Sequence, residues 1–227
     1  MPTDVTELLE DNAEATSRDR QERAPPKPDR GVRRDPGGKR EAVIDAAERI
    51  VRDEGVGALK ARRLATEAGV ALGTPVNLFG SIENVIAAVN ARTFDRLADA
   101  LDAVPRSPDP QTDLVDLGKA YAGFVASRPH LWALVFEGHV GEMGSNPNDE
   151  RVAGLLARLD DRVTASLGTD RKYEARVLWG AVHGLVSLSV TGRTQLLGLP
   201  DLGEAVTALV TRYLWGARGQ DGGDAAR

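Results

Sequence analysis

Residues 60–85 read "KARRLATEAGVALGTPVNLFGSIENV" and contain two short helical segments joined by a glycine turn. The first segment spans about Lys60–Ala68 and ends at Gly69, which supplies the positive φ that a sharp turn needs. The second runs through Leu78, and Ser81 can then cap a longer helix. Two short helices joined at a glycine, between two longer ones, are the layout of a helix-turn-helix.

The segments on either side of this stretch are also helical. Apolar residues recur at three- and four-residue spacing from Val43 to Val51, and again from Ile82 to Leu101, which predicts two amphipathic helices. Beyond the proline-containing segment 105–110, five further stretches have helical periodicity, and no stretch alternates with a period of two for long enough to form a sheet. The predicted class is all-α, divided into a disordered arm (1–38), a helix-turn-helix domain (39–80), a connecting helix (81–104), a helical ligand-binding and dimerisation domain (105–218) and a disordered tail (219–227).

The composition limits the function classes. The chain of 227 residues is 41% apolar and contains no Cys, which excludes disulfides, thiolate metal sites and a cysteine nucleophile. No apolar run approaches the roughly 20 residues of a membrane span, so we expect a cytoplasmic protein without a membrane partner. The net charge is −5, yet residues 30–63 hold ten Lys or Arg against six Asp or Glu. This local excess favours an anionic partner for that segment.

Residues 43–89, "VIDAAERIVRDEGVGALKARRLATEAGVALGTPVNLFGSIENVIAAV", resemble the N-terminal domain of the tetracycline-repressor (TetR) family. The resemblance is strong in "DAA", "RLATEAGV" and the spaced "F-G-S-x-E". The later "LWGAVHGLVSLSV", 178–190, resembles a C-terminal domain type of the same family, which has a Trp followed by His-Gly. The resemblance implies a homodimeric transcription regulator, usually a repressor, that leaves its DNA when a small molecule binds the C-terminal domain.

The expected recognition helix contains no Lys or Arg, so base reading and phosphate binding must be divided between segments. Asn77 can pair with adenine, while Thr74 and Val76 can contact a thymine methyl group. Phosphate contacts are then expected from basic residues nearby, namely Lys39, Lys60, Arg62 and Arg63, and from the arm "RGVRR" at 30–34. Arg62 matches a position where the family often has Arg. Solvated surface arginines, and Asn77 as a helix cap, are the alternatives to contacts with double-stranded DNA.

Two positions depart from the family pattern. Val76 stands where the family often has Tyr, and Ile82 stands where it usually has Lys; both usual residues typically bind phosphates. Pro75 also disfavours a helical conformation at Thr74, which can instead serve as the N-cap. These departures support an alternative function, a helical protein that binds a small molecule or a partner and whose DNA-reading domain has decayed.

Aromatic residues at four-residue spacing mark the expected ligand site of the C-terminal domain. Trp179 and His183 share one helix face, Trp132 and Phe136 share another, and Phe124 lies on a further amphipathic helix. Together they predict a pocket for an apolar or aromatic small molecule, with His183 as its polar group. A core histidine bonded to a backbone carbonyl, and simple core packing of Trp132 and Phe136, are the alternatives.

No metal, cofactor or catalytic site is expected. His130, His139 and His183 match no usual ligand spacing, and no nucleophile elbow, phosphate loop or HExxH motif occurs, so the chain is not expected to be an enzyme. The last two predicted helices carry broad apolar faces that could pack on the body or on a second copy. One short helix-turn-helix makes few contacts with DNA, and a two-fold DNA site doubles them. We therefore expect a homodimer on a palindromic operator.

Overall fold

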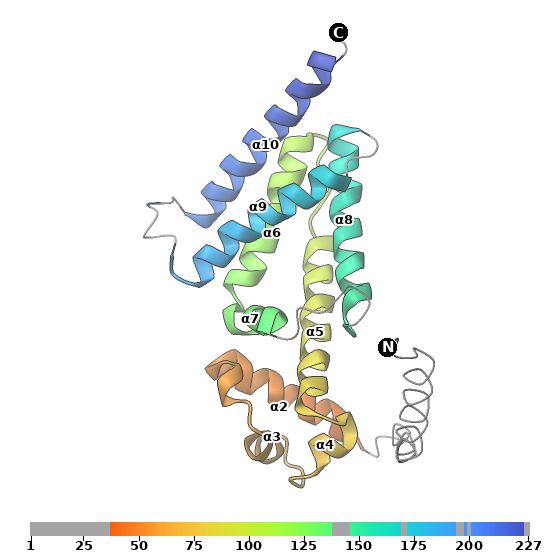
Figure 1. Cartoon of the computed structure of the whole chain (residues 1–227), viewed down its shortest axis with the longest axis vertical. Coiled ribbons are helices and arrows are strands. Elements are labelled where there is room, and N and C mark those ends of the chain that lie inside the picture. The colour runs from red at the N-terminus through yellow and green to blue at the C-terminus, as the bar shows by residue number, and fades with distance from the viewer. Residues whose placement is uncertain (1–36, 138–145, 169–171, 194–197, 199–200, 225–227) are drawn as a thin grey trace, which may run out of the picture. The chain divides into compact units, whose positions relative to one another are not determined.

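The computed structural model describes residues 37–137, 146–168, 172–193, 198 and 201–224, and within them every regular element is a helix (Figure 1). This confirms the predicted all-α class. The arm at 30–34 lies outside the described residues. The elements are α2 (Lys39–Glu54), the 3₁₀ turn η1 (Val56–Ala58), α3 (Ala61–Glu67), α4 (Thr74–Phe79), α5 (Ile82–Asp102), α6 (Pro110–Ala126), α7 (Pro129–Glu137), α8 (Asp149–Leu167), α9 (Lys172–Val190) and α10 (Leu202–Asp224).

The helices α2, α3 and α4 pack with the start of α5 around one hydrophobic cluster, which we call the reader core. Phe79 is buried there with Ile44, and Ile86 packs against them. Gly69 has φ 64° and ends α3. The backbone N–H of Val70 donates to the Ala65 carbonyl at 2.9 Å, so the turn satisfies a carbonyl that the helix end would leave unpaired.

The ends of three helices test the expected caps. The Ser81 hydroxyl accepts from the backbone N–H of Asn84 at 3.2 Å, which confirms the predicted cap of α5. The start of α4 differs from the prediction: the helix begins at Thr74, with Gly73 in the cap position. Pro75 fits one position further in, because the first turn of a helix has no intrahelical acceptor for its N–H groups. The helical domain was expected to end at residue 218, yet α10 continues to Asp224.

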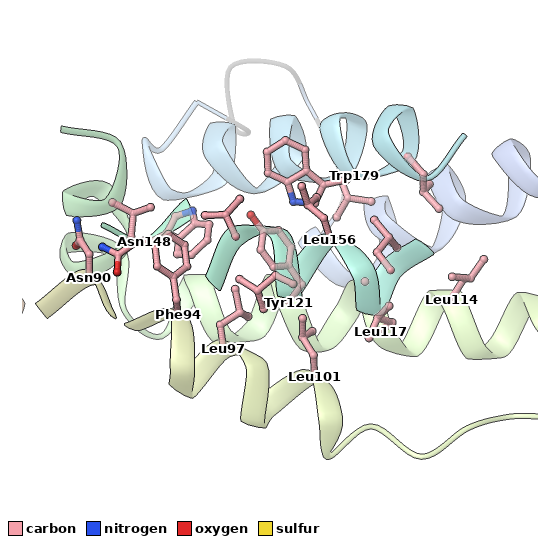
Figure 2. Close-up of a pocket in the computed structure, with 18 of the residues that line it drawn as sticks. Asn90, Phe94, Leu97, Leu101, Leu114, Leu117, Tyr121, Asn148, Leu156 and Trp179 are labelled. Carbon is pink, nitrogen blue, oxygen red and sulfur yellow. The ribbon is translucent and has the colours of Figure 1, made fainter. Parts of the chain in front are cut away.

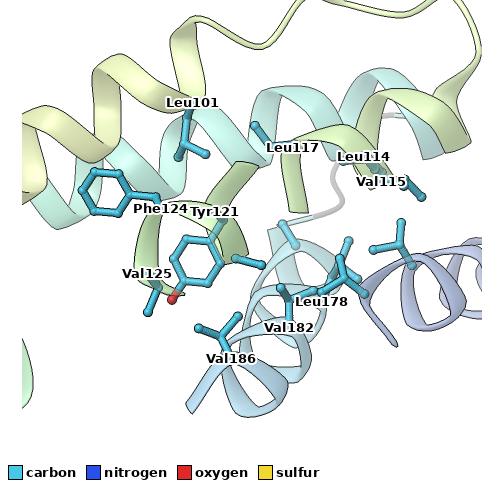
Figure 3. Close-up of a cluster of buried hydrophobic side chains, with 14 of the residues drawn as sticks. Leu101, Leu114, Val115, Leu117, Tyr121, Phe124, Val125, Leu178, Val182 and Val186 are labelled. Atoms are coloured by element: carbon cyan, nitrogen blue, oxygen red, sulfur yellow. The ribbon is translucent and has the colours of Figure 1, made fainter. Parts of the chain in front are cut away.

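The second cluster, which we call the body core, fills the space between α5, α6, α8, α9 and α10. Figure 3 shows side chains of α5, α6 and α9 converging around Tyr121. At the edge of this core, Arg162 donates to the Asp113 carboxylate at 2.9 Å and to the Val104 carbonyl at 2.6 Å, and Asp113 also accepts from the backbone N–H of Ser107. The buried pair therefore holds the segment between α5 and α6 against α8.

The helix α5 belongs to both clusters. Val85 and Val89, near its start, are fully buried in the reader core, whereas Leu97 and Leu101, near its end, lie in the body core. The two clusters are thus joined through one continuous helix.

The short helix α7 also has two buried faces. Leu131 and Leu134 pack in the reader core, while Trp132 packs in the body core and Val135 against it. Residues at three-residue spacing share a helix face, so α7 separates the two clusters while contacting both.

The crossing of α6 over α10 requires a glycine. A Cβ at Gly118 would meet Cγ1 of Val206 at 2.9 Å, and Val206 is fully buried and stiff at χ1. We expect Gly118→Ala to lower the free energy of unfolding by about 1–3 kcal/mol, measured by urea denaturation. Gly123→Ala, also on α6, is the control because its Cβ would meet nothing within 4 Å. Equal stability of the two variants would contradict this close crossing.

Candidate functional site

Exposed cations lie at the start of α2 and around the start of α3. Lys60 immediately precedes α3, Arg62 lies in its first turn, and Lys39 begins α2; all three side chains are exposed. Neither Lys60 nor Arg62 forms an ion pair with another residue that the structure describes. Their charges are therefore available to an anionic partner.

Arg63 differs from its neighbour Arg62. Its Nη1 donates to Oε2 of Glu54 at 2.6 Å, and its Nη2 bonds the other carboxylate oxygen. This hydrogen bond holds the pKa of Glu54 below its ordinary value. The charge of Arg63 is partly committed to joining α3 to the end of α2, a role that the sequence pattern did not indicate.

The outer surface of α4 is uncharged. Val76 is 44% exposed and Asn77 is exposed, whereas Thr74 is half-buried and Pro75 is buried. Asn77 lies inside the helix and its backbone N–H donates to the Gly73 carbonyl, so it does not occupy an N-cap position. Thr74, Val76 and Asn77 are thus brought together on one short helix.

Two side chains from other helices hold the end of α4. Arg40 of α2 donates to the Leu78 carbonyl at 3.0 Å, and its guanidinium lies 4.1 Å from the centre of the Phe79 ring. Asn84 of α5 donates to the Phe79 carbonyl at 2.7 Å. The last carbonyls of a helix have no intrahelical partner, so these bonds fix a helix that is only six residues long.

An ion cluster joins α2 to α5. Glu48 is 9% exposed and accepts hydrogen bonds from Arg92 and Arg96. Burial alone would raise the pKa of Glu48, but the hydrogen bonds and positive charges of both arginines outweigh burial and lower it. Arg92 also donates to Asp45 at 2.6 Å and bonds Glu41. The cluster therefore couples the orientation of α2 to that of α5.

The body contains a cavity of about 240 Å³ between α5, α6, α7, α8 and α9 (Figure 2). Its walls are mainly apolar, with leucine the most frequent residue, and none of the described residues that line it is charged. Trp132 and Trp179 lie in the wall, as do Tyr121, Asn90 and Asn148. An apolar cavity with a few polar groups is typical of a small-molecule site.

His183 lies beside the cavity wall in a chain of polar groups. Its Nδ1 is 2.7 Å from the Tyr121 hydroxyl and its Nε2 is 3.2 Å from the Ser187 hydroxyl. The Trp179 ring stacks on the imidazole, with centroids 5.0 Å apart. Burial lowers the pKa of His183 and raises that of Tyr121, so both groups are neutral near pH 7. His183 therefore positions Tyr121 and Trp179 and does not itself line the cavity.

The remaining expected ligand residues lie elsewhere. Phe124 is buried in the body core, faces Arg128 and does not line this cavity. Phe136 belongs to α7, but its side chain lies outside the described residues. Asn90, Asn148 and Tyr121 line the cavity but were not predicted to do so. An isolated Asn in a helical stretch has no distinctive sequence pattern.

The described residues contain no candidate metal site and no candidate membrane span. No group of three His, Cys, Asp or Glu side chains in the described residues could hold a metal ion, and His139 lies outside them. Among the helices that the structure describes, none has the length and apolar character to cross a membrane.

Comparisons with known proteins point to one family. Residues 114–213 match the model of the tetracyclin repressor-like C-terminal domain. Over 156 residues, 67% of this chain and 71% of the relative, the sequence is 26% identical to an uncharacterized HTH-type transcriptional regulator of Mycobacterium tuberculosis.

Solved structures share the fold. A tetR-family transcriptional regulator from Streptomyces coelicolor superposes with a TM-score of 0.65 at 16% identity, covering 82% of this chain and 84% of its own. A protein of unknown function from Rhodococcus sp. RHA1 gives a TM-score of 0.65 at 24% identity, covering 83% and 98%. At these identities the likeness concerns the arrangement of the helices.

The half-buried His183 predicts a pH dependence of stability. Its pKa in the folded protein lies below the ordinary value of about 6.5, so the unfolded chain binds a proton more readily and stability falls as the pH drops below about 6.5. We expect His183→Gln to lose less unfolding free energy than the wild type between about pH 7.5 and 5.5, measured by urea denaturation. Parallel pH profiles for the two proteins would contradict burial of a neutral His183.

Proposed function

We infer from the match of residues 114–213 and from the shared fold that the chain is a member of the TetR family, and on that premise we propose that it is a dimeric, cytoplasmic DNA-binding regulator, a repressor that releases a palindromic operator when a small molecule binds. DNA binding is supported by one observation on the helix-turn-helix domain, residues 39–80, which we call the reader. Its candidate base-contacting residues and its candidate phosphate-contacting residues lie on different helices. The uncharged outer face of α4 carries Thr74, Val76 and Asn77. Lys60 and Arg62, which form no ion pair with another described residue, lie at the start of the preceding helix. Base contacts specify a sequence, whereas phosphate contacts position the protein.

The absence of charge on α4 does not oppose this function. Reading bases in the major groove needs hydrogen-bonding groups and methyl contacts, which Asn77 and Val76 offer. Leu72, 61% exposed in the turn before α4, would offer a further apolar contact to a base. With few phosphate-binding residues on each copy, we expect modest affinity and a preference for half-sites that contain A·T pairs.

A second copy of the chain is proposed to pack on α9 and α10. Tyr173 and Val177 are 78% and 40% exposed on α9 and lie one turn apart, and Trp215 of α10 is 82% exposed. Large apolar side chains exposed together favour an interface. Two-fold pairing of this face would bring two readers to one DNA duplex, and each reader would then contact one half-site.

The cavity can influence the reader through α7 and α5. Trp132 and Val135 line the cavity, while Leu131 and Leu134 of the same helix pack in the reader core. A ligand that displaces the first pair therefore also shifts the second pair against α2. Such a shift would change the separation of the two readers in the dimer, and by linkage DNA would weaken ligand binding by the same factor.

The two neighbouring arginines of α3 test DNA binding. We expect Arg62→Ala to weaken binding to a fragment selected from the genome by about ten-fold at low salt and to reduce the salt slope by about 1, because a phosphate contact is lost. Arg63→Ala is the matched control and should weaken binding less, because Arg63 is bonded to Glu54. The measurement is fluorescence anisotropy across a salt titration.

The same selection distinguishes the two functions that the sequence allows. Enrichment of a palindromic fragment whose binding falls steeply with salt would support the regulator. No enriched fragment, with a folded dimer in hand, would favour the small-molecule- or partner-binding protein whose reader has decayed.

The proposed interface is tested by adding charge to it. Val177→Arg should convert the dimer to a monomer, since two symmetry-related arginines would face each other across an apolar contact. Ala157→Arg adds the same charge to an exposed position of α8 and should leave the dimer intact. The measurement is size-exclusion chromatography with light scattering, and a dimeric Val177→Arg protein would exclude this face as the interface.

A further inference from the structure

A buried amide lies at one end of the cavity. Asn90, on α5, is 7% exposed, and its Nδ2 donates to the Leu134 carbonyl of α7 at 3.3 Å. Because a carbonyl only accepts hydrogen bonds, this contact fixes which end of the amide faces α7. The Asn90 Oδ1 is consequently turned away from Leu134, and it is buried with no hydrogen-bond partner among the described residues.

The neighbouring amide at this end, Asn148, already uses its Nδ2 in a hydrogen bond. Asn148 is 3% exposed, and its Nδ2 donates to the Ala87 carbonyl, one turn before Asn90 on α5. Figure 2 shows Asn90 and Asn148 together at one end of the cavity, with Leu114 toward the other end. Asn148 therefore holds α5 at the start of α8, and Asn90 retains an acceptor that has not been used.

The rest of the cavity wall defines the other requirements of a ligand. The Tyr121 hydroxyl is bonded to His183, and the described residues that line the cavity include no charged side chain. A carboxylate or an ammonium group would lose its hydration there without gaining a counter-charge. A buried acceptor without a donor is also unfavourable, so a ligand that supplies the donor gains affinity.

We propose that the effector is a neutral, mainly apolar molecule with one hydroxyl or amide N–H group, which donates to the Asn90 Oδ1 while its body lies along the leucine side chains of α5, α6 and α8. This proposal rests on the function proposed above, because it takes the cavity as the effector site. It narrows the effector class: fatty or aromatic acids and organic cations are excluded, and alcohols, phenols and neutral amides fit.

Three probes of similar shape test the proposal on the full chain by isothermal titration calorimetry: β-naphthol, its methyl ether and β-naphthoate. We expect naphthol to bind about ten-fold more tightly than the ether, the equivalent of one buried hydrogen bond, and naphthoate to bind most weakly. Equal binding of naphthol and ether would overturn the donor requirement and leave the cavity as the effector site. Tighter binding of naphthoate would overturn the requirement for neutrality.

Two variants assign the preference to its residue. Asn90→Leu should bind naphthol and the ether equally, because it keeps the branched shape and the number of heavy atoms of the side chain and removes the acceptor. Tyr121→Phe removes the hydroxyl of another residue in the cavity wall and should keep the preference for naphthol. A preference lost in Tyr121→Phe and kept in Asn90→Leu would overturn the assignment. Failure of every probe to bind the wild type would overturn both this proposal and the cavity as the effector site.

Discussion

The rest of the structure depends on the double membership of α5 in the two hydrophobic clusters. Val85 and Val89 cannot leave the reader core, and Leu97 cannot leave the body core, without exposing apolar surface. The ion cluster around Glu48 adds a second constraint, because it fixes α2 on the same helix. A movement of α5 therefore also moves the reader, and a ligand that displaces α5 would change the position of the reader.

The recognition helix α4 is very short, and side chains of two other helices form hydrogen bonds with its last carbonyl groups. Six residues form too few intrahelical bonds to be stable alone, and the carbonyls at the end of α4 are bonded by Arg40 and Asn84. This support explains how a helix with Pro75 near its start and no charged residue can keep a defined orientation. Two basic residues of this region also contribute to the fold, because Arg40 bonds the end of α4 and Arg63 bonds Glu54.

Periodicity and turn chemistry were sufficient to predict the class, the order of the helices, the glycine turn at Gly69 and the cap at Ser81. The end of α10 was not predicted correctly, because a glycine such as Gly216 is only modestly unfavourable inside a helix and does not have to end it. The partner of Arg63, the polar contacts of His183 and the unused acceptor of Asn90 depend on contacts distant in sequence, which local spacing does not encode.

The alternation along α7 has an evolutionary consequence. Leu131 and Leu134 pack in the reader core, whereas Trp132 and Val135 line the cavity, so substitutions at neighbouring positions act on different parts of the molecule. Drift at the cavity positions can change which compound is sensed while the packing beneath the reader stays intact. The same separation makes this helix a convenient site for building biosensors that respond to new chemicals through an unchanged output.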